Sequence, residues 1–199
     1  SMTTSNHRPY TYPDGRIDIK SPGHREGGVK YTDYAIGAFL KAAQAKPWFK
    51  DTVFVIVADH CASVAGKREL EIRKYEIPLF IWSPGNIAPR KFDTMMSQID
   101  TAPTVLGLLG ANYLSRFVGN DALSPSFRPR AFISNYQELG YLSQNQLTVL
   151  GPKQKVETFN IAKDGSATPT EVNPKLRDEA IAYYQSAFQA FKTGALKFK

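Results

Sequence analysis

The sequence predicts an α/β fold, because short apolar runs typical of strands alternate with segments of helical periodicity. The clearest strand is the run Val-Phe-Val-Ile-Val-Ala at 53–58, which is bounded, rich in β-branched residues and too short for most helices. A helical pattern precedes it at 29–46, and a second apolar run follows at 77–82. Helix, strand, charged connection and strand, in this order, are expected of an α/β sheet. At 199 residues, 42% of them hydrophobic, the chain is long enough to bury a core.

The N-terminal segment predicts a long loop followed by a helix. Residues 8–28 hold prolines and glycines at close intervals, and a loop of this length in a compact domain is usually functional or mobile. From Val29 to about Lys46 the pattern is helical, and Pro47 closes it. The apolar residues that recur there at spacings of three and four are Ile36, Phe39, Leu40 and Ala43.

The middle of the chain predicts two strands joined by a charged connection. The run at 53–58 is expected to be buried, and the connection at 62–76 is polar. The second strand, at 77–82, ends in the turn signal Ser83-Pro84-Gly85. Pro78 stands at the start of this strand, where proline is tolerated.

Residues 100–110 predict a short capped helix. Asp100 is the expected N-cap, Pro103 lies in the first turn and Gly110 is the expected C-terminal stop.

The C-terminal third predicts a small antiparallel meander and a final helix. Short strand-like pieces appear at 131–134, 146–150 and 156–161, separated by turn signals. Asn173-Pro174 then gives a cap followed by a proline in the first turn of a helix. Its apolar stripe, which should pack on the sheet, consists of Leu176, Ala180, Tyr184, Ala187, Phe188 and Phe191.

Two potential metal ligands directly follow the strand at 53–58. In open α/β sheets ligands bind beyond the carboxyl ends of the strands, which is where Asp59 and His60 would stand. Their neighbouring oxygen and nitrogen donors suit a divalent metal, although an Asp after a strand is also a common turn residue. Cys61 is the only cysteine, which excludes an internal disulfide. We interpret Cys61 as a small residue after the strand rather than as a thiolate ligand or nucleophile.

A second group of candidates lies at Asn6-His7-Arg8. A neutral imidazole can bind a metal or act as a general acid, and an arginine can bind an ester oxyanion. The alternative is an ordinary loop histidine, which is the interpretation we favour for His24. The segment 8–12 also combines basic and aromatic residues that could stack on bases. One such cluster does not predict a nucleic-acid partner, and we expect none.

Composition narrows the functional classes. Lys and Arg number 25 and Asp and Glu 18, so the net charge of +7 favours anionic partners such as phosphate or sulfate esters. The basic residues are scattered, and a solvated surface explains most of them. The sequence has no phosphate-binding glycine loop, no G-x-S-x-G elbow and no H-E-x-x-H motif. No apolar run reaches the roughly 18–20 residues of a membrane helix, so we expect a soluble chain.

Taken in order, these motifs resemble the sulfatase-type enzymes of the alkaline phosphatase superfamily. The ordered set extends over about residues 3–120. Within the family, the chain most resembles the branch of bacterial lipoteichoic-acid-synthase-like and phosphoglycerol-transferase-like enzymes. The motifs are Asn6-His7 before a Pro/Tyr loop, the helix at 31–39, the strand ending in Asp59-His60, Ile77-Pro78-Leu79, and Gln98 to Gly110.

The resemblance implies a specific fold and domain division. The chain would be the C-terminal part of an alkaline-phosphatase-like α/β sandwich, with a small antiparallel meander and a terminal helix. Residues 1–120 would form the C-terminal part of the catalytic domain, and residues 121–199 its last strands and helix.

The resemblance also implies roles for the candidate residues. In this family a Thr, Ser or formylglycine attacks phosphorus or sulfur while bound to a divalent metal. Asp59 and His60 correspond to an Asp-His pair of metal ligands, for Mn, Mg, Zn or Ca. Asn6-His7 corresponds to the motif whose imidazole contacts the ester or leaving group, so His7 is the expected catalytic residue, with Asn6, His7 and Arg8 binding substrate.

The chain departs from the family pattern in what it lacks. It contains no counterpart of the nucleophile, of the remaining acidic ligand or of the membrane helices. We therefore expect a C-terminal fragment, inactive alone, whose partner is the missing N-terminal half of the same protein. The parent would lie in the bacterial cytoplasmic membrane through those absent helices, with an extracytoplasmic catalytic domain. At Cys61, relatives often have Gly, Asp or another small or polar residue.

The expected activity is transfer or hydrolysis of phosphate or sulfate esters, most specifically phosphoglycerol transfer to envelope glycopolymers. The alternatives are a true sulfatase, a phosphoethanolamine transferase or a non-catalytic polyanion-binding module.

Overall fold

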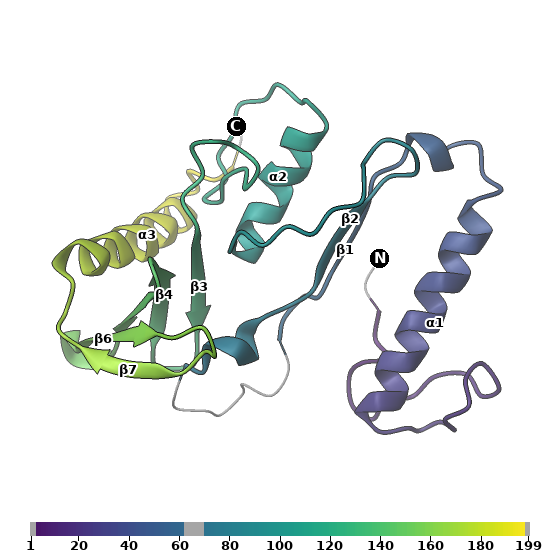
Figure 1. Ribbon diagram of the computed structural model, residues 1–199, viewed down its shortest axis with the longest axis horizontal. Helices are drawn as coiled ribbons and strands as arrows, with labels where there is room; N and C mark the ends of the chain where they lie inside the picture. The colour runs from purple at the N-terminus through teal and green to yellow at the C-terminus, as the bar shows by residue number, and fades with distance from the viewer. Residues whose placement is uncertain (1–2, 62–69, 198–199) are drawn as a thin grey trace. The chain divides into compact units, whose positions relative to one another are not determined.

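The chain folds into two compact units of mixed helices and strands. The structure is a computed structural model that describes residues 3–61 and 70–197 (Figure 1). One unit comprises Ser1–Phe54 with Trp82–Ala88, and the other comprises Val55–Ile81 with Pro89–Lys199. The predicted α/β class is confirmed. The predicted boundary near residue 120 stays a prediction.

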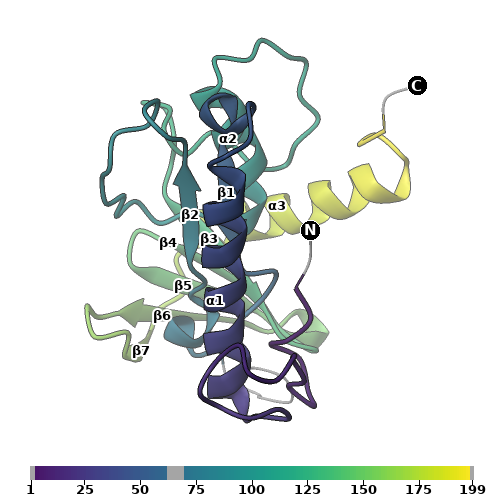
Figure 2. The same ribbon diagram turned by 90° about the vertical axis from the view of Figure 1, so that its right-hand side faces the viewer.

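The first unit is built on helix α1, Arg25–Ala43, with the N-terminal loop gathered around its first turns (Figures 1 and 2). The helix begins four residues before the predicted Val29 and ends before the predicted Lys46. Gly27 was assigned to the loop, yet it lies inside the helix, at a point where the loop passes too close for a side chain. A Cβ on Gly27 would come within 2.2 Å of the Tyr12 hydroxyl oxygen.

An aromatic cluster closes the other end of α1. Phe49, in the 3-10 turn η1 (Phe49–Asp51), lies 5.6 Å from Phe54 between ring centroids. Phe54 in turn lies 5.2 Å from Trp82. Ala43 at the end of α1 is buried against Phe49 and Phe54. Large aromatic rings bury much apolar area, so this cluster forms a small hydrophobic core of the first unit.

Strands β1 (Phe54–Val57) and β2 (Leu79–Trp82) pair as a two-stranded sheet. The sequence predicted a buried strand here, and for β1 this is wrong: Phe54 is buried, but Val55 and Val57 are each 38% exposed. These two valines share one face of a strand that has a single neighbour, so its apolar residues remain accessible. The predicted turn after β2 is confirmed, since the Asn86 amide donates to the Ser83 carbonyl at 3.2 Å.

The second unit is built on a five-stranded antiparallel meander. Its strand order is β3-β4-β5-β6-β7, which confirms the predicted meander and its three strands β3, β5 and β6. Strands β4 and β7, which carry Gly140 and Pro169, were not predicted from the sequence. The strands span Arg130–Ser134, Leu139–Ser143, Gln146–Leu150, Val156–Ile161 and Ala167–Thr170.

Both faces of this sheet are covered. Helix α3, Pro174–Lys192, packs on one face, where Leu176 and Ala180 are fully buried against Tyr141 (Figure 1). The predicted stripe packs only over the first half of α3, because Phe188 and Phe191 are 62% and 72% exposed. The opposite face holds a second core of Leu70, Ile133, Leu142, Leu147 and Val149.

The helix predicted at 100–110 forms as the 3-10 turn η3 (Gln98–Asp100) followed by α2 (Thr101–Leu108). Asp100 does not cap α2 through its side chain, which corrects the prediction. The extra turn moves the start to Ser97, whose amide donates to the Asp100 carboxylate at 2.9 Å in a capping box. Gly110 ends the helix at φ 63°, as predicted.

The remaining turns are short. The 3-10 turns η2 (Ile72–Tyr75) and η4 (Pro152–Gln154) lie in the second unit. Part of the predicted charged connection, residues 62–69, falls outside the described residues. Within 3–61 and 70–197, no helix combines the length and apolar character needed to cross a bilayer.

Candidate active site

Asp59 and His60 stand directly after β1, as predicted. The His60 backbone amide donates to Asp59 Oδ1 at 3.0 Å, so one carboxylate oxygen is held against the chain. The His60 ring nitrogen Nδ1 lies 2.7 Å from the carbonyl oxygen of Cys61. Because a carbonyl can only accept, Nδ1 carries a proton in this contact, so Nε2 is the ring nitrogen that remains to bind a metal.

The two free donor atoms of this pair suit a single cation. Asp59 Oδ2 and His60 Nε2 are 3.6 Å apart, and both side chains are largely exposed. Two ligands at about 2.1 Å from a tetrahedral ion are separated by roughly 3.4 Å. A metal-binding imidazole usually donates its other N–H to a backbone carbonyl or carboxylate, as His60 does. Asp59 and His60 therefore fit as two ligands of a divalent metal.

Two ligands alone leave a metal site incomplete. Among residues 3–61 and 70–197, no group of three or more His, Cys, Asp and Glu side chains could hold an ion. Cys61 is free and partly exposed.

Asn6, His7 and Arg8 lie on a tight turn of the first unit. The His7 amide donates to the Thr4 carbonyl at 3.0 Å, and the Tyr10 amide donates to the His7 carbonyl at 2.8 Å. The His7 ring nitrogen Nδ1 lies 2.8 Å from the Arg8 carbonyl oxygen. As in His60, Nδ1 donates in this contact, so Nε2 is the ring nitrogen that remains to contact a ligand.

The turn is fixed to α1 by close packing. Ser5 Oγ and Thr32 Oγ1 are 2.9 Å apart, which ties the loop to the second turn of the helix. A Cβ on Gly28 would lie 2.6 Å from the Ser5 carbonyl oxygen and 3.3 Å from Asn6 Oδ1. Only glycine permits this approach, so Gly28 lets the Ser5 carbonyl and the Asn6 side chain lie against α1.

Two residues that the sequence analysis did not assign to the site join this cluster. The hydroxyl of Tyr10 hydrogen-bonds the guanidinium groups of Arg25 and Arg8, and these contacts lower the pKa of Tyr10. Arg25 comes from the first turn of α1. The spacing of Arg8 and Tyr10 was visible in the sequence, but nothing local indicated Arg25. The fold thus brings two guanidinium groups to the Tyr10 hydroxyl, and one of them belongs to Arg8, which directly follows His7. Guanidinium groups can bind an oxyanion.

The predicted site residues fall into both units. Asn6, His7 and Arg8 belong to the first, and Asp59 and His60 belong to the second. Each set has its own supporting contacts. That His7 and the Asp-His pair act on one substrate stays a prediction.

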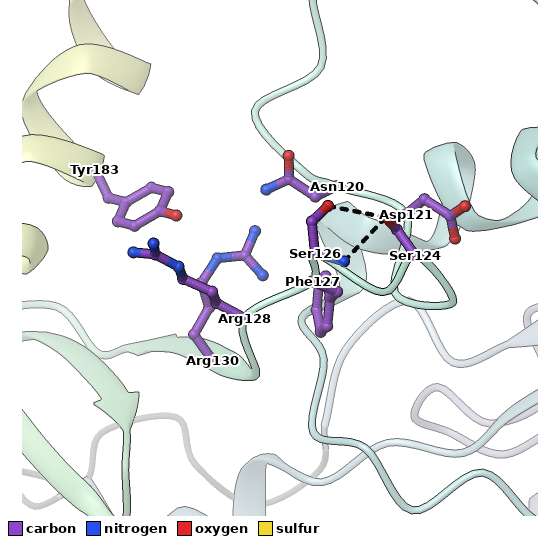
Figure 3. A pocket seen from close by; sticks show the side chains of 8 residues that line it. All are labelled: Asn120, Asp121, Ser124, Ser126, Phe127, Arg128, Arg130 and Tyr183. Atoms are coloured by element: carbon purple, nitrogen blue, oxygen red, sulfur yellow. Dashed lines mark hydrogen bonds between the residues drawn. The ribbon is translucent and has the colours of Figure 1, made fainter.

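A separate polar pocket of about 370 Å³ lies in the second unit (Figure 3). Tyr183 of α3 borders one side, and Asn120 and Ser126 border the other. The buried Arg130 of this pocket is already neutralised by Asp100, with two contacts of 2.9 Å. None of the residues predicted from the sequence lines it. The full lining is Asn120, Asp121, Ser124, Ser126, Phe127, Arg128, Arg130 and Tyr183.

Comparison with known proteins identifies the family. The family model described as Sulfatase matches residues 1–111, more than half of the chain. The chain belongs to the sulfatase family. The matched region of this sulfatase-family chain contains both predicted groups, Asn6 to Arg8 and Asp59-His60.

Individual relatives agree with this assignment. An endo-4-O-sulfatase of Bacteroides thetaiotaomicron is 30% identical over 110 residues, 52% of this chain and 21% of the relative. Phosphoglycerol transferase I of Salmonella newport is 24% identical over 163 residues, 81% of this chain and 20% of the relative. The predicted branch therefore appears among the relatives of this sulfatase-family chain.

A solved structure supports the fold over almost the whole chain. A protein of the alkaline phosphatase superfamily from Vibrio parahaemolyticus is 35% identical, with a TM-score of 0.90. The similarity covers 99% of this chain and 49% of that protein. The sulfatase-family chain thus spans about half of this structural relative and about a fifth of the two curated relatives.

Proposed function

We propose that the chain is the C-terminal part of a metal-dependent sulfatase-family enzyme that hydrolyses or transfers phosphate or sulfate esters. The most specific form of the proposal is phosphoglycerol transfer to envelope glycopolymers. The observation that carries it is the Asp59-His60 pair, with Oδ2 and Nε2 free and 3.6 Å apart at the end of β1. The metal would be Mn, Mg, Zn or Ca.

The residues of this chain would bind and orient the reactants. Asp59 Oδ2 and His60 Nε2 would hold the metal, which lowers the pKa of a bound nucleophile and offsets charge on the transferred group. The Nε2 atom of His7 would contact the ester or leaving-group oxygen. Arg8 would bind the remaining ester oxygens through its guanidinium.

The rest of the site would come from the longer protein. The nucleophile and the remaining acidic ligand would lie in the N-terminal half, so the 199-residue chain alone should not turn over substrate. That half would also provide the membrane helices, with the catalytic domain on the outer face of the bacterial cytoplasmic membrane. The coverage of only about half of the structural relative supports this division.

The test uses the intact parent protein and two ester substrates. Asp59→Asn and His60→Ala should lower the Mn²⁺-, Mg²⁺- or Zn²⁺-dependent cleavage of the ester, measured as the alcohol released, by more than the roughly 10–100-fold that follows loss of a supporting group. His24→Ala is the matched control, since His24 stands outside the proposed site. Unchanged activity in both site variants would refute the metal assignment.

The same assay separates the alternatives. Turnover of a sulfate ester alone would make the parent a true sulfatase, and phosphoethanolamine transfer would place it in that class of transferases. A polyanion-binding module, which the net charge of +7 favours, would instead bind polyanions in a salt-sensitive way that chelators do not affect.

A further inference from the structure

The end of β1 is held by one side chain from a distant part of the second unit. Gln98 Nε2 donates to the carbonyl oxygen of Ala58 at 2.8 Å and to the carbonyl oxygen of Asp59 at 2.9 Å. Both partners are carbonyls, which only accept, so the amide nitrogen of Gln98 must face them. The two bonds use both hydrogens of this amide.

These contacts begin where the strand pairing stops. The last described bond between the neighbouring strand segments joins the Ala58 amide to the Pro78 carbonyl at 3.4 Å. Beyond it, the described backbone bond of the metal-binding pair is local, from the His60 amide to Asp59 Oδ1. Gln98 therefore fixes the peptide from which the Asp59 and His60 side chains project.

The backbone of Gln98 is itself rigidly anchored. It lies in η3, where Ser97 and Asp100 form a capping box. Asp100 is fully buried and pairs through both carboxylate oxygens with Arg130 of β3. The Phe132 amide also donates to Ser97 Oγ at 2.8 Å. The side-chain amide of Gln98 thus reaches the end of β1 from a backbone that is anchored to β3. Gln98 itself is exposed.

We propose that Gln98 is a positioning residue for the Asp59-His60 pair. By holding the carbonyls of Ala58 and Asp59, it keeps Oδ2 and Nε2 at the separation that one cation needs. The inference rests on the proposed function, because it assumes that these two atoms bind metal. Groups that orient metal ligands typically change affinity by about 10–100-fold when removed.

The test measures metal binding directly, without turnover. Zn²⁺ is titrated into the 199-residue chain, and the ring signals of His60 are followed by NMR. Gln98→Met keeps the length of the side chain and removes both donors, so the dissociation constant for Zn²⁺ at His60 should rise about 10-fold. The thermal midpoint should stay within about 2 °C, because the replaced side chain is exposed.

Asn86→Ala is the matched control. Asn86 is another exposed amide that donates to a distant backbone carbonyl, that of Lys50 at 2.8 Å, but in the first unit. This variant should bind Zn²⁺ like the unchanged chain. An equal loss of affinity in Asn86→Ala would mean that losing any such side-chain hydrogen bond weakens Zn²⁺ binding. It would overturn the specific role of Gln98.

The remaining outcomes separate the inference from the proposed function. If Asp59→Asn removes the Zn²⁺-dependent shifts of the His60 ring but Gln98→Met binds with unchanged affinity, the positioning role is wrong and the metal pair stands. If Asp59→Asn also leaves the Zn²⁺-dependent shifts of the His60 ring unchanged, the metal assignment itself fails.

Discussion

At the residue scale, the local environment of each functional side chain depends on a few close contacts. His7 and His60 both direct Nδ1 to the carbonyl of the following residue, at 2.8 and 2.7 Å. The same short-range contact thus selects the same tautomer in both units and leaves Nε2 available. A histidine in the sequence indicates possible catalysis or metal binding. The hydrogen bond made by Nδ1 decides that Nε2 is the ring nitrogen left for that role.

Gly28 provides a test of the packing that positions Asn6. Gly28→Ala should lower the free energy of unfolding by about 1–3 kcal/mol, because its Cβ would lie 2.6 Å from the Ser5 carbonyl oxygen. Urea denaturation measures the change. Gly37→Ala, in the same helix with nothing within 4 Å, should instead raise stability by about 0.5–1 kcal/mol. Equal effects of the two alanines would contradict the proposed close approach.

The substitution Arg130→Met tests the ion pair with Asp100 that anchors η3. Arg130 and Asp100 are 1% and 0% exposed, so Arg130→Met would leave a buried carboxylate without its cation. We expect a loss of about 3–5 kcal/mol in unfolding free energy, measured by chemical denaturation. Arg128→Met, two residues away and exposed, should change stability by no more than about 0.5 kcal/mol. A small effect at Arg130 would mean that the core tolerates the free carboxylate.

At the scale of elements, helix α3 and the meander depend on one another. Tyr141 of β4 is 2% exposed, and its hydroxyl donates to Glu179 of α3 at 3.0 Å. Tyr184 of α3 donates to the Gly140 carbonyl at 2.9 Å. Burial thus combines with polar contacts from both elements along α3 as far as Tyr184, whereas Phe188 and Phe191, farther along the helix, are exposed.

This interface predicts a loss of stability at alkaline pH. Burial, and next the hydrogen bond to Glu179, raise the pKa of Tyr141 from 10.0 to about 12. The folded state therefore binds this proton more tightly than the unfolded state. The contribution is complete below pH 10 and declines as pH rises toward 12, by on the order of 2 kcal/mol.

Urea unfolding between pH 8 and pH 11.5 measures this effect. In Tyr141→Phe the decline above pH 10 should be shallower than in the unchanged chain. Part of the decline should remain, because burial also raises the pKa of Tyr184. Identical slopes in the two proteins would contradict the assignment to Tyr141.

Local signals explain which elements the sequence predicts correctly. The start of α3 was predicted because Asn173 accepts from the Lys175 and Leu176 amides, a contact that needs only adjacent residues. Strand β4 was missed because it contains Gly140, which weakens the strand pattern. Its glycine is required by packing, since a Cβ there would lie 2.8 Å from side-chain atoms of both Leu70 and Ile133. Pro169 hid β7 in the same way, and the strand forms at the sheet edge, beside β6 alone.

At the scale of the whole molecule, the proposed metal ligands follow a strand of the two-stranded sheet of β1 and β2, and apolar side chains of this sheet are exposed. Val55 and Val57 are each 38% exposed, and Phe80 is 61% exposed. Apolar side chains on a sheet of only two strands give little independent stability. If the chain is part of a longer enzyme, its remaining half should cover these residues.

Hydrogen exchange tests this expectation. The amides of Val55 and Val57 should exchange at least about 10-fold more slowly in the intact parent than in the 199-residue chain, because added packing raises the free energy of local opening. The amide of Leu147, central in the five-stranded sheet, should exchange at similar rates in both proteins. Equal rates for β1 would mean that the other half of the parent does not cover this sheet.

The sequence alone determined that a β-branched run ends in Asp59-His60, that Asn6-His7-Arg8 precedes a Pro/Gly-rich loop, and that these motifs follow the order of the sulfatase family. Only the tertiary structure decided what supports them. Gln98 reaches Asp59 across 39 residues of sequence, and Arg25 meets Tyr10 through the packing of a loop on α1. Helix and strand propensities depend on near neighbours, whereas such contacts depend on how distant segments pack together.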